Sequence, residues 1–75
     1  MFKKNDLVRS VSIVTVNDAR RNKLVKRGDL GQVLNTNTLD YGQGRTVQKV
    51  QVLWLAGEGL GTTSILNYHE LMRAS

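Results

Sequence analysis

The sequence predicts a small all-β domain, a curled antiparallel barrel of four to five short strands. Three observations lead to this prediction: segments rich in β-branched residues dominate the chain, connections rich in Gly, Asn and Asp separate them, and one short helical turn is expected near the C-terminus. The chain has 75 residues and no cysteine, so no disulfide can stabilise it. One domain over residues 1–75 buries only a thin core and depends on a well-patterned sheet or on oligomerisation.

Four segments have the composition of strands: residues 7–16, 30–36, 46–56 and 62–66. In the first, the apolar side chains change parity near Ile13 and Val14, which indicates a bulge or a strand buried on both faces where the sheet curls. The third has the clearest alternation, with Val50, Val52 and Trp54 on one face. We therefore expect the Trp54 side chain in the core.

Two glycine-rich connections separate the later strands. Residues 35–45, NTNTLDYGQGR, tolerate positive φ or bond their own backbone, so they predict a turn-rich loop. The GEGLG of residues 57–61 resembles a phosphate-binding loop. However, the β-prone TTSIL follows it where that chemistry needs a helix, and a hairpin is predicted instead.

The C-terminal segment LNYHELMRAS predicts a short helical or 3₁₀ turn. Asn67 precedes Glu70 by three residues, which is a variant of the capping box. We expect the turn to be buried by Leu66, Leu71 and Met72.

The long first connection contains VNDARRNKLVKRG, residues 16–28. Asn17 or Asp18 could cap a helix here, and Gly28 could close it in the left-handed conformation. Such a helix would carry a basic stripe and two apolar anchors, too few for a stable independent helix. A charged loop with a helical turn is the alternative, and residues 18–27 are left as either helix or loop.

The net charge of +5 is concentrated at the start of the chain. Residues 1–27 hold eight of the eleven Lys and Arg residues but only two of the six acidic residues. This asymmetry favours a polyanionic partner, DNA or RNA. The alternative interpretation is a solvated basic face that keeps a small protein soluble.

We predict that the basic side chains contact phosphates, which supply much of the affinity of nucleic-acid-binding proteins without reading sequence. The densest cluster consists of Arg20, Arg21, Lys23, Lys26 and Arg27. Folding could bring three more cations to it: Lys3, Lys4 and Arg9. Tyr41, in a polar loop, is the best candidate for stacking on a base.

Two segments resemble a known fold family. KKNDLVRS, residues 3–10, resembles the K-G-D-x-V-x-V opening of SH3-like barrel domains, with Asn5 in place of glycine. KRGDLGQVL, residues 26–34, resembles the K-G-x-x-G-x-V segment of KOW-type domains in ribosomal proteins and transcription elongation factors, with Gly28 and Gly31 as the motif glycines. VQVLW and TTSILNYHELM match the third strand and the last strands around a 3₁₀ turn.

The resemblance covers most of the chain and implies an SH3-like barrel with a long charged first loop and a short C-terminal helical turn. In KOW domains only a few residues separate the first strand from the glycine pair, whereas residues 11–27 intervene here, so KOW membership is left open. SH3-like relatives often use loops beside the sheet to contact RNA, DNA or protein. The small size and long loop also resemble orphan SH3-like proteins encoded by phages.

Other function classes find less support in the sequence. His69 has no cysteine to activate and Ser64 has no base partner in a motif, so we expect no catalytic residue, no cofactor and no enzyme activity. A single histidine without cysteines gives no metal site. No signal peptide or membrane span is recognisable, which predicts a cytoplasmic protein. The alternatives are a protein-interaction module acting on a host or viral protein, and a structural homo-oligomer formed through sheet edges.

Overall fold

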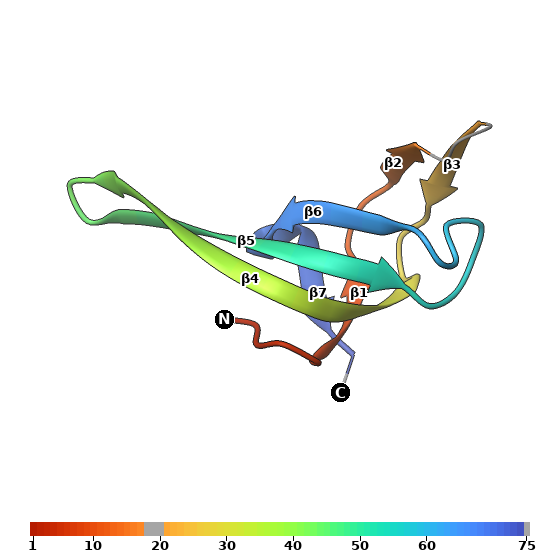
Figure 1. Cartoon of the computed structure of the whole chain (residues 1–75), viewed down its shortest axis with the longest axis horizontal. Coiled ribbons are helices and arrows are strands. Elements are labelled where there is room, and N and C mark those ends of the chain that lie inside the picture. The colour runs from red at the N-terminus through yellow and green to blue at the C-terminus, as the bar shows by residue number, and fades with distance from the viewer. Residues whose placement is uncertain (18–20, 75) are drawn as a thin grey trace.

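The structure is a computed structural model that describes residues 1–17 and 21–74. Two antiparallel sheets form nearly all of its regular secondary structure (Figure 1). The elements are β1 (Leu7–Ser10), β2 (Val14–Asn17), β3 (Asn22–Val25), β4 (Leu30–Gly42), β5 (Arg45–Trp54), β6 (Thr63–Asn67), the 3₁₀ helix η1 (Tyr68–Glu70) and β7 (Leu71–Arg73). One sheet has the order β6-β5-β4-β1-β7, and β2 pairs with β3 separately. The predicted all-β class is confirmed. Within the described ranges, no helix has the length and apolar character needed to cross a membrane.

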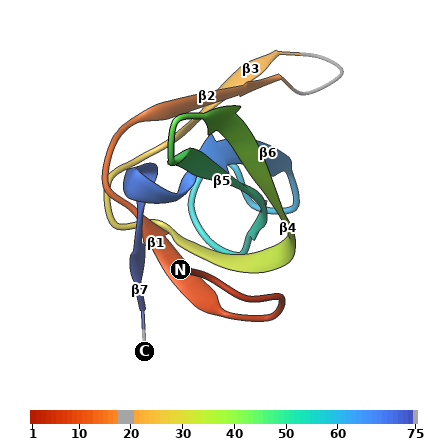
Figure 2. The ribbon, with the colours of Figure 1, turned by 90° about the vertical axis from the view of Figure 1, so that its left-hand side faces the viewer.

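The five-stranded sheet curls around one apolar core (Figure 2). Val50, Val52 and Trp54 point into it from β5 and are fully buried, which confirms the predicted alternation and the core position of Trp54. The indole Nε1–H of Trp54 donates to Ser64 Oγ at 2.9 Å, so its polar atom is satisfied. Across the ladder, Gly31 carries no side chain because Val52 and Trp54 fill the space beside its Cα.

The segment predicted as one strand over residues 7–16 forms two strands in different sheets. β1 ends at Ser10, whose buried hydroxyl donates to the Ser12 carbonyl oxygen. The N–H of Val11 then donates to the Glu70 carbonyl oxygen at 3.1 Å. These bonds lead the chain out of the first sheet before β2 begins. The parity change in the sequence therefore marks an exit from the sheet, and the single-strand prediction is wrong.

No helix forms in the described part of the first connection, where β2 and β3 pair instead. Val16 and Val25 bury their side chains against the β5–β6 turn, and a Cβ on Gly59 would lie 2.8 Å from a Val25 methyl group. Alternating residues of two paired strands can share this contact, whereas a helix would spread them over several faces. The interpretation of residues 18–27 as helix or loop is wrong for β3, and residues 18–20 lie outside the described residues.

A long hairpin replaces the loop predicted at residues 35–45. β4 continues to Gly42 and pairs with β5 as far as Arg45, with two register shifts. Only Gln43 and Gly44 turn the chain, at φ +55° and +74°. The alternating Asn and Thr side chains of β4 fit a ladder because β5 supplies the partner strand. We call residues 39–47, which project beyond β6, the arm (Figure 1).

The hairpin predicted around residues 57–61 is confirmed. Trp54 exchanges main-chain bonds across it, donating to the Thr62 carbonyl oxygen at 2.9 Å and accepting from the Gly61 N–H at 2.9 Å. β6 follows the turn directly, so its glycines shape a chain reversal and do not precede a helix.

The C-terminal turn is the 3₁₀ helix η1, as predicted. Leu66 and Leu71 flank it and are buried. Met72 is 51% exposed, and Asn67 makes no capping bond with its side chain, so these two expectations are wrong. The reason is that η1 is a single turn, and β7 begins at Leu71 and points Met72 outward.

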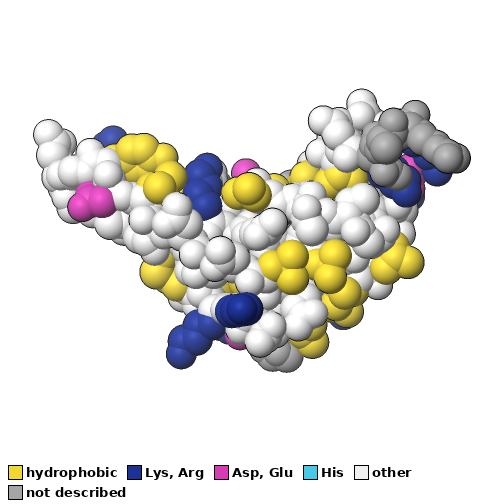
Figure 3. All heavy atoms as spheres, in the orientation of Figure 1, with side chains coloured by type: hydrophobic (Ala, Val, Ile, Leu, Met, Phe, Trp, Pro, Cys, Tyr) yellow, Lys and Arg dark blue, Asp and Glu magenta, His cyan; other side chains and the backbone are white. Residues whose placement is uncertain are grey.

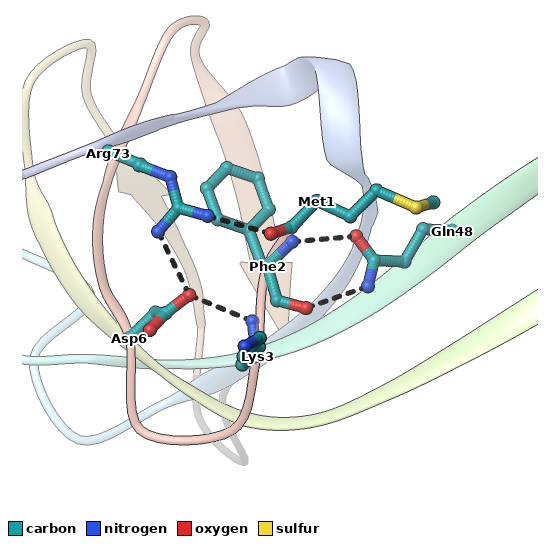
Figure 4. A network of polar contacts seen from close by, with 6 residues as sticks. All are labelled: Met1, Phe2, Lys3, Asp6, Gln48 and Arg73. Carbon is teal, nitrogen blue, oxygen red and sulfur yellow. Dashed lines mark hydrogen bonds and ion pairs between the residues drawn. The ribbon is translucent and has the colours of Figure 1, made fainter.

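The two chain ends meet over β5 in a group of contacts that we call the terminal clasp (Figure 4). Gln48 is buried; its Oε1 accepts from the Phe2 N–H at 3.1 Å and its Nε2 donates to the Phe2 carbonyl oxygen at 2.9 Å. The Arg73 guanidinium lies 5.4 Å from the Phe2 ring centre. It also donates to the Met1 carbonyl oxygen at 2.7 Å and to Asp6 Oδ2 at 3.2 Å.

Candidate nucleic-acid interface

A tight corner joins β3 to β4 beside the end of β1. The Lys26 carbonyl oxygen accepts from the Asp29 N–H at 3.1 Å, and Gly28 between them has φ +90°, which glycine adopts without steric cost. The corner is bonded to β1, because the Gly28 N–H donates to the Ser10 carbonyl oxygen at 2.8 Å and the Ser10 N–H donates to the Asp29 carbonyl oxygen at 3.1 Å. The predicted left-handed conformation of Gly28 is confirmed, although the element before it is a strand.

Backbone carbonyls hold two guanidinium groups at this corner. Arg9 Nη1 donates to the Gly28 carbonyl oxygen at 2.9 Å, and Arg27 Nε donates to the Val11 carbonyl oxygen at 3.1 Å. Both residues are exposed. A guanidinium has five N–H donors, so one bond orients the group and leaves other donors for solvent or a ligand.

The positive charge of the corner is not compensated by the described acidic residues. No carboxylate among them forms an ion pair with Arg9, Lys26 or Arg27, which we call the corner cations. Asp29 is adjacent in the chain, but its carboxylate accepts from the Lys26 backbone N–H at 2.9 Å and lies against Gly57. The corner therefore presents fixed and exposed positive charge.

Two more of the predicted cations belong to the β2–β3 hairpin. Arg21 directly precedes β3 and is exposed, while Lys23 is half-buried on the face that carries Val16. Because β3 leads directly into the corner, these two residues precede Lys26 along one extended segment. Figure 3 shows Lys and Arg side chains gathered at this hairpin. Arg20, also predicted, lies outside the described residues.

The fold separates three other predicted residues from the corner. Lys3 and Lys4 are exposed in the turn before β1, whereas the corner contacts the other end of that strand. Tyr41 is 64% exposed in the arm, which projects away from the β2–β3 hairpin (Figure 1). Of the residues expected to join the basic cluster through folding, only Arg9 does so.

A groove on the outer face of the sheet was missed by sequence reasoning. It has a volume of about 230 Å³ and crosses three strands, and it is lined by Asn35, Thr36, Asn37, Lys49, Gln51 and Ile65. The signal for it was the alternation of Asn and Thr after residue 34. The composition of residues 35–45 predicts a turn-rich loop, whereas in β4 the Asn35 and Asn37 side chains share a strand face.

The described residues contain no group of three His, Asp or Glu side chains that could hold a metal ion. Comparison of the chain with protein-family models, with curated proteins and with solved structures found no match. What the protein does has to be inferred from the contacts and charges of the corner, the hairpin and the groove.

Proposed function

We propose that this chain is an SH3-like barrel that binds nucleic acid without catalysing a reaction. Its phosphate contacts come from the corner cations and from the cations of the β2–β3 hairpin. Three features support the barrel: the curl of the sheet, the long first connection between β1 and β4, and η1 between β6 and β7. They agree with the features that the sequence resemblance implies.

The observation that carries the proposal is the pair of guanidinium groups fixed by backbone carbonyls. Ordering a long surface side chain on binding costs about 0.5–1.5 kcal/mol. The bonds from Arg9 to Gly28 and from Arg27 to Val11 restrict both side chains before a ligand arrives. The two side chains then lose less conformational entropy when an anion binds, which increases the affinity of the corner for the anion.

The chemistry of these groups suits an oxyanion such as phosphate. A guanidinium presents parallel N–H donors that match two oxygens of one phosphate, and it keeps its charge at every physiological pH. Lys26 adds a point charge on the same turn. Phosphate contacts position a protein on nucleic acid without reading bases, so this site is expected to bind many sequences with similar affinity.

A salt titration tests the proposal. Binding of fluorescein-labelled DNA and RNA oligonucleotides is measured by anisotropy between about 50 and 300 mM salt, where log affinity should fall linearly with log salt. Replacing the three corner cations together (Arg9→Gln, Lys26→Gln, Arg27→Gln) removes three phosphate contacts, so the slope should fall by about two to three units.

The matched control removes the same amount of charge elsewhere, with Lys3→Gln, Lys4→Gln and Arg45→Gln. This variant should keep most of the wild-type slope, because those cations lie away from the corner. An equal loss in both triple variants would show that net charge and not the corner binds the ligand. Absence of binding by the wild type at about 50 mM salt would refute the proposal.

A protein-interaction module is the second candidate, and the edge strand β6 favours it. This strand carries no charged residue and exposes Ile65, which is 70% accessible. An uncharged edge can accept a strand from another chain. If this is the main function, the wild type but not the Ile65→Lys variant should retain a specific protein from nuclease-treated lysate.

A further inference from the structure

The groove on the outer face combines donors and acceptors from three strands in register. Asn35 lies opposite Gln51, and Gln51 lies opposite Ile65; one step along the strands on the same face, Asn37 lies opposite Lys49. Lys49 and Gln51 alternate with the buried valines of β5, so they face away from the core. All of the described lining residues except Thr36, which lies opposite the buried Val50, thus place their side chains on one sheet face.

The side chains of the groove have the chemistry that binds a nucleobase. Asn35, Asn37 and Gln51 supply carboxamides, the kind of group that can pair with a base edge. Asn35 Oδ1 already accepts from the Thr36 N–H at 3.0 Å, so Asn35 offers mainly its amino group as a donor. Ile65 is 70% exposed and offers an apolar surface for the face of a planar ring. Among the described residues that line the groove, only Lys49 is charged, and its charge complements a phosphodiester backbone.

We propose that this groove accepts an unpaired base, so that the protein binds single-stranded nucleic acid in preference to a duplex. The inference rests on the proposed function, in which the corner cations hold the phosphates. The groove has a volume of about 230 Å³, which fits a single small planar group. Sites for whole drug-sized ligands are larger and start at roughly 300 Å³.

The shape of the site favours a single strand. In a duplex, base edges lie at the floor of a major groove roughly 8.5 Å deep, and only a projecting element reaches them. The carboxamides of this site instead line a groove on a sheet face, in which Asn35 and Asn37 are exposed. A base that is splayed out of a single strand can enter such a groove, as bases do in sequence-specific recognition of single-stranded RNA.

An extended peptide fits the groove less well than a base. Peptides that bind to sheets pair with main-chain groups at a strand edge. Within the groove, the main-chain groups of β4 and β5 already bond to one another and to β6 in the ladders, so a peptide could pair only with the outer edge of β6, beyond Ile65. The single positive charge of Lys49 also favours an anionic chain over a neutral one.

One strand of nucleic acid can reach both the groove and the corner. β4 begins two residues after Gly28 and carries Asn35, seven residues beyond it. At about 3.3 Å per residue, the two sites are separated by at most roughly 23 Å along the strand. A short oligonucleotide spans this distance, so phosphates at the corner and a base in the groove can belong to one ligand.

The test compares two single strands of equal length and charge, one with bases and one abasic, by anisotropy with the wild-type protein. We expect the strand with bases to bind about tenfold more tightly, the scale of one well-made base contact, and a duplex to bind more weakly than the single strand. The Asn35→Ala, Gln51→Ala double variant should reduce the preference for bases to less than about twofold while the salt slope stays unchanged.

The matched control is Gln32→Ala, a carboxamide on β4 that does not line the groove, and it should keep the preference. Equal binding of the abasic strand by the wild type, or tighter binding of the duplex, would overturn the inference and leave the proposed function standing. Retention of the preference by the double variant would also overturn it. Absence of binding to every strand would reject both proposals together. The wild-type comparison needs no substitution and therefore does not depend on the folding of a variant.

Discussion

The two ends of β1 use arginine in different ways. At the terminal clasp, Arg73 donates to the Asp6 carboxylate at 3.2 Å and covers the Phe2 ring, so its charge is compensated and it links the chain ends. At the corner, Arg9 and Arg27 donate to carbonyl oxygens at 2.9 and 3.1 Å. A carbonyl orients a guanidinium but does not neutralise it. The positive charge of the corner therefore stays uncompensated by a described carboxylate, whereas the charge of Arg73 at the clasp is paired with Asp6.

This difference shows why a count of cations is a poor guide to a binding site. Arg73 and Arg9 are both exposed. What separates them is the partner that the fold supplies, a carboxylate in one case and a carbonyl in the other. If the comparison is correct, substitutions at the clasp should lower the stability of the fold without changing oligonucleotide binding. Substitutions at the corner should weaken oligonucleotide binding without lowering the stability.

The largest effect is expected at the clasp from Phe2→Ala. The Phe2 ring is 9% exposed and belongs to the core cluster, so its removal should lower the free energy of unfolding by about 3 kcal/mol, the lower end of the range for buried Phe. Urea unfolding followed by Trp54 fluorescence measures this loss. A small domain has little stability in reserve, so a large part of the variant should be unfolded at 37 °C or above.

The control for this measurement is Arg9→Ala, an exposed position at the corner that should change stability by less than about 0.5 kcal/mol. A loss below about 1 kcal/mol for Phe2→Ala would mean that the first residues detach without cost. In that case the clasp would not stabilise the sheet, and the contrast with the corner would fail.

A smaller effect is expected from Arg73→Ala. The substitution removes the contact with the Phe2 ring and the bond to the Met1 carbonyl oxygen, which together should cost about 1 kcal/mol because the site is open to solvent. Affinity for oligonucleotides and its salt dependence should stay at the wild-type values. Weakened binding by Arg73→Ala with unchanged stability would place the phosphate site at the clasp and reverse the comparison.

The sequence predicted the parts of the fold in which local pattern and tertiary contacts agree. β5 alternates apolar and polar residues and forms as expected, with Trp54 in the core. The glycine-rich turn before β6 also forms, because its local chemistry already specifies a reversal. β3 was missed, and β2 was predicted as part of one strand with β1, because β2 and β3 are each four residues long and pack on a distant turn at Gly59. The local sequence pattern of β2 and β3 does not indicate that they contact the turn at Gly59.

The candidate site was predicted in composition but not in arrangement. Lys26 and Arg27 were identified from the density of charge, yet their association with Arg9 depends on the bonds between the corner and β1. The groove was missed because Asn35 and Gln51 are opposite each other only in the register of the β4–β5 ladder. Sequence composition indicates the kind of partner, but the register decides which side chains meet.

The smallest expected effect is a pH dependence of stability at the clasp. The Lys3 backbone N–H, which donates to Asp6 Oδ2 at 2.8 Å, lowers the pKa of the Asp6 carboxyl below its ordinary value of 3.8, and the Arg73 charge adds to this. A lowered folded-state pKa stabilises the fold above the ordinary pKa, and this stabilisation is lost as pH falls through the folded value. The guanidinium groups of the corner bond to carbonyl oxygens and not to a carboxylate, so no corner variant should share the effect.

Asp6→Asn isolates this contribution, because the amide does not titrate. At about pH 6 the wild type should unfold at a slightly higher urea concentration than Asp6→Asn, and the two midpoints should converge as the pH is lowered to about 2. Arg9→Ala serves as the control, since its small difference from the wild type should not depend on pH. If the gap between the wild type and Asp6→Asn were the same at both pH values, the charge of the Asp6 carboxylate, with its bond from the Lys3 N–H and its ion pair with Arg73, would not contribute to stability.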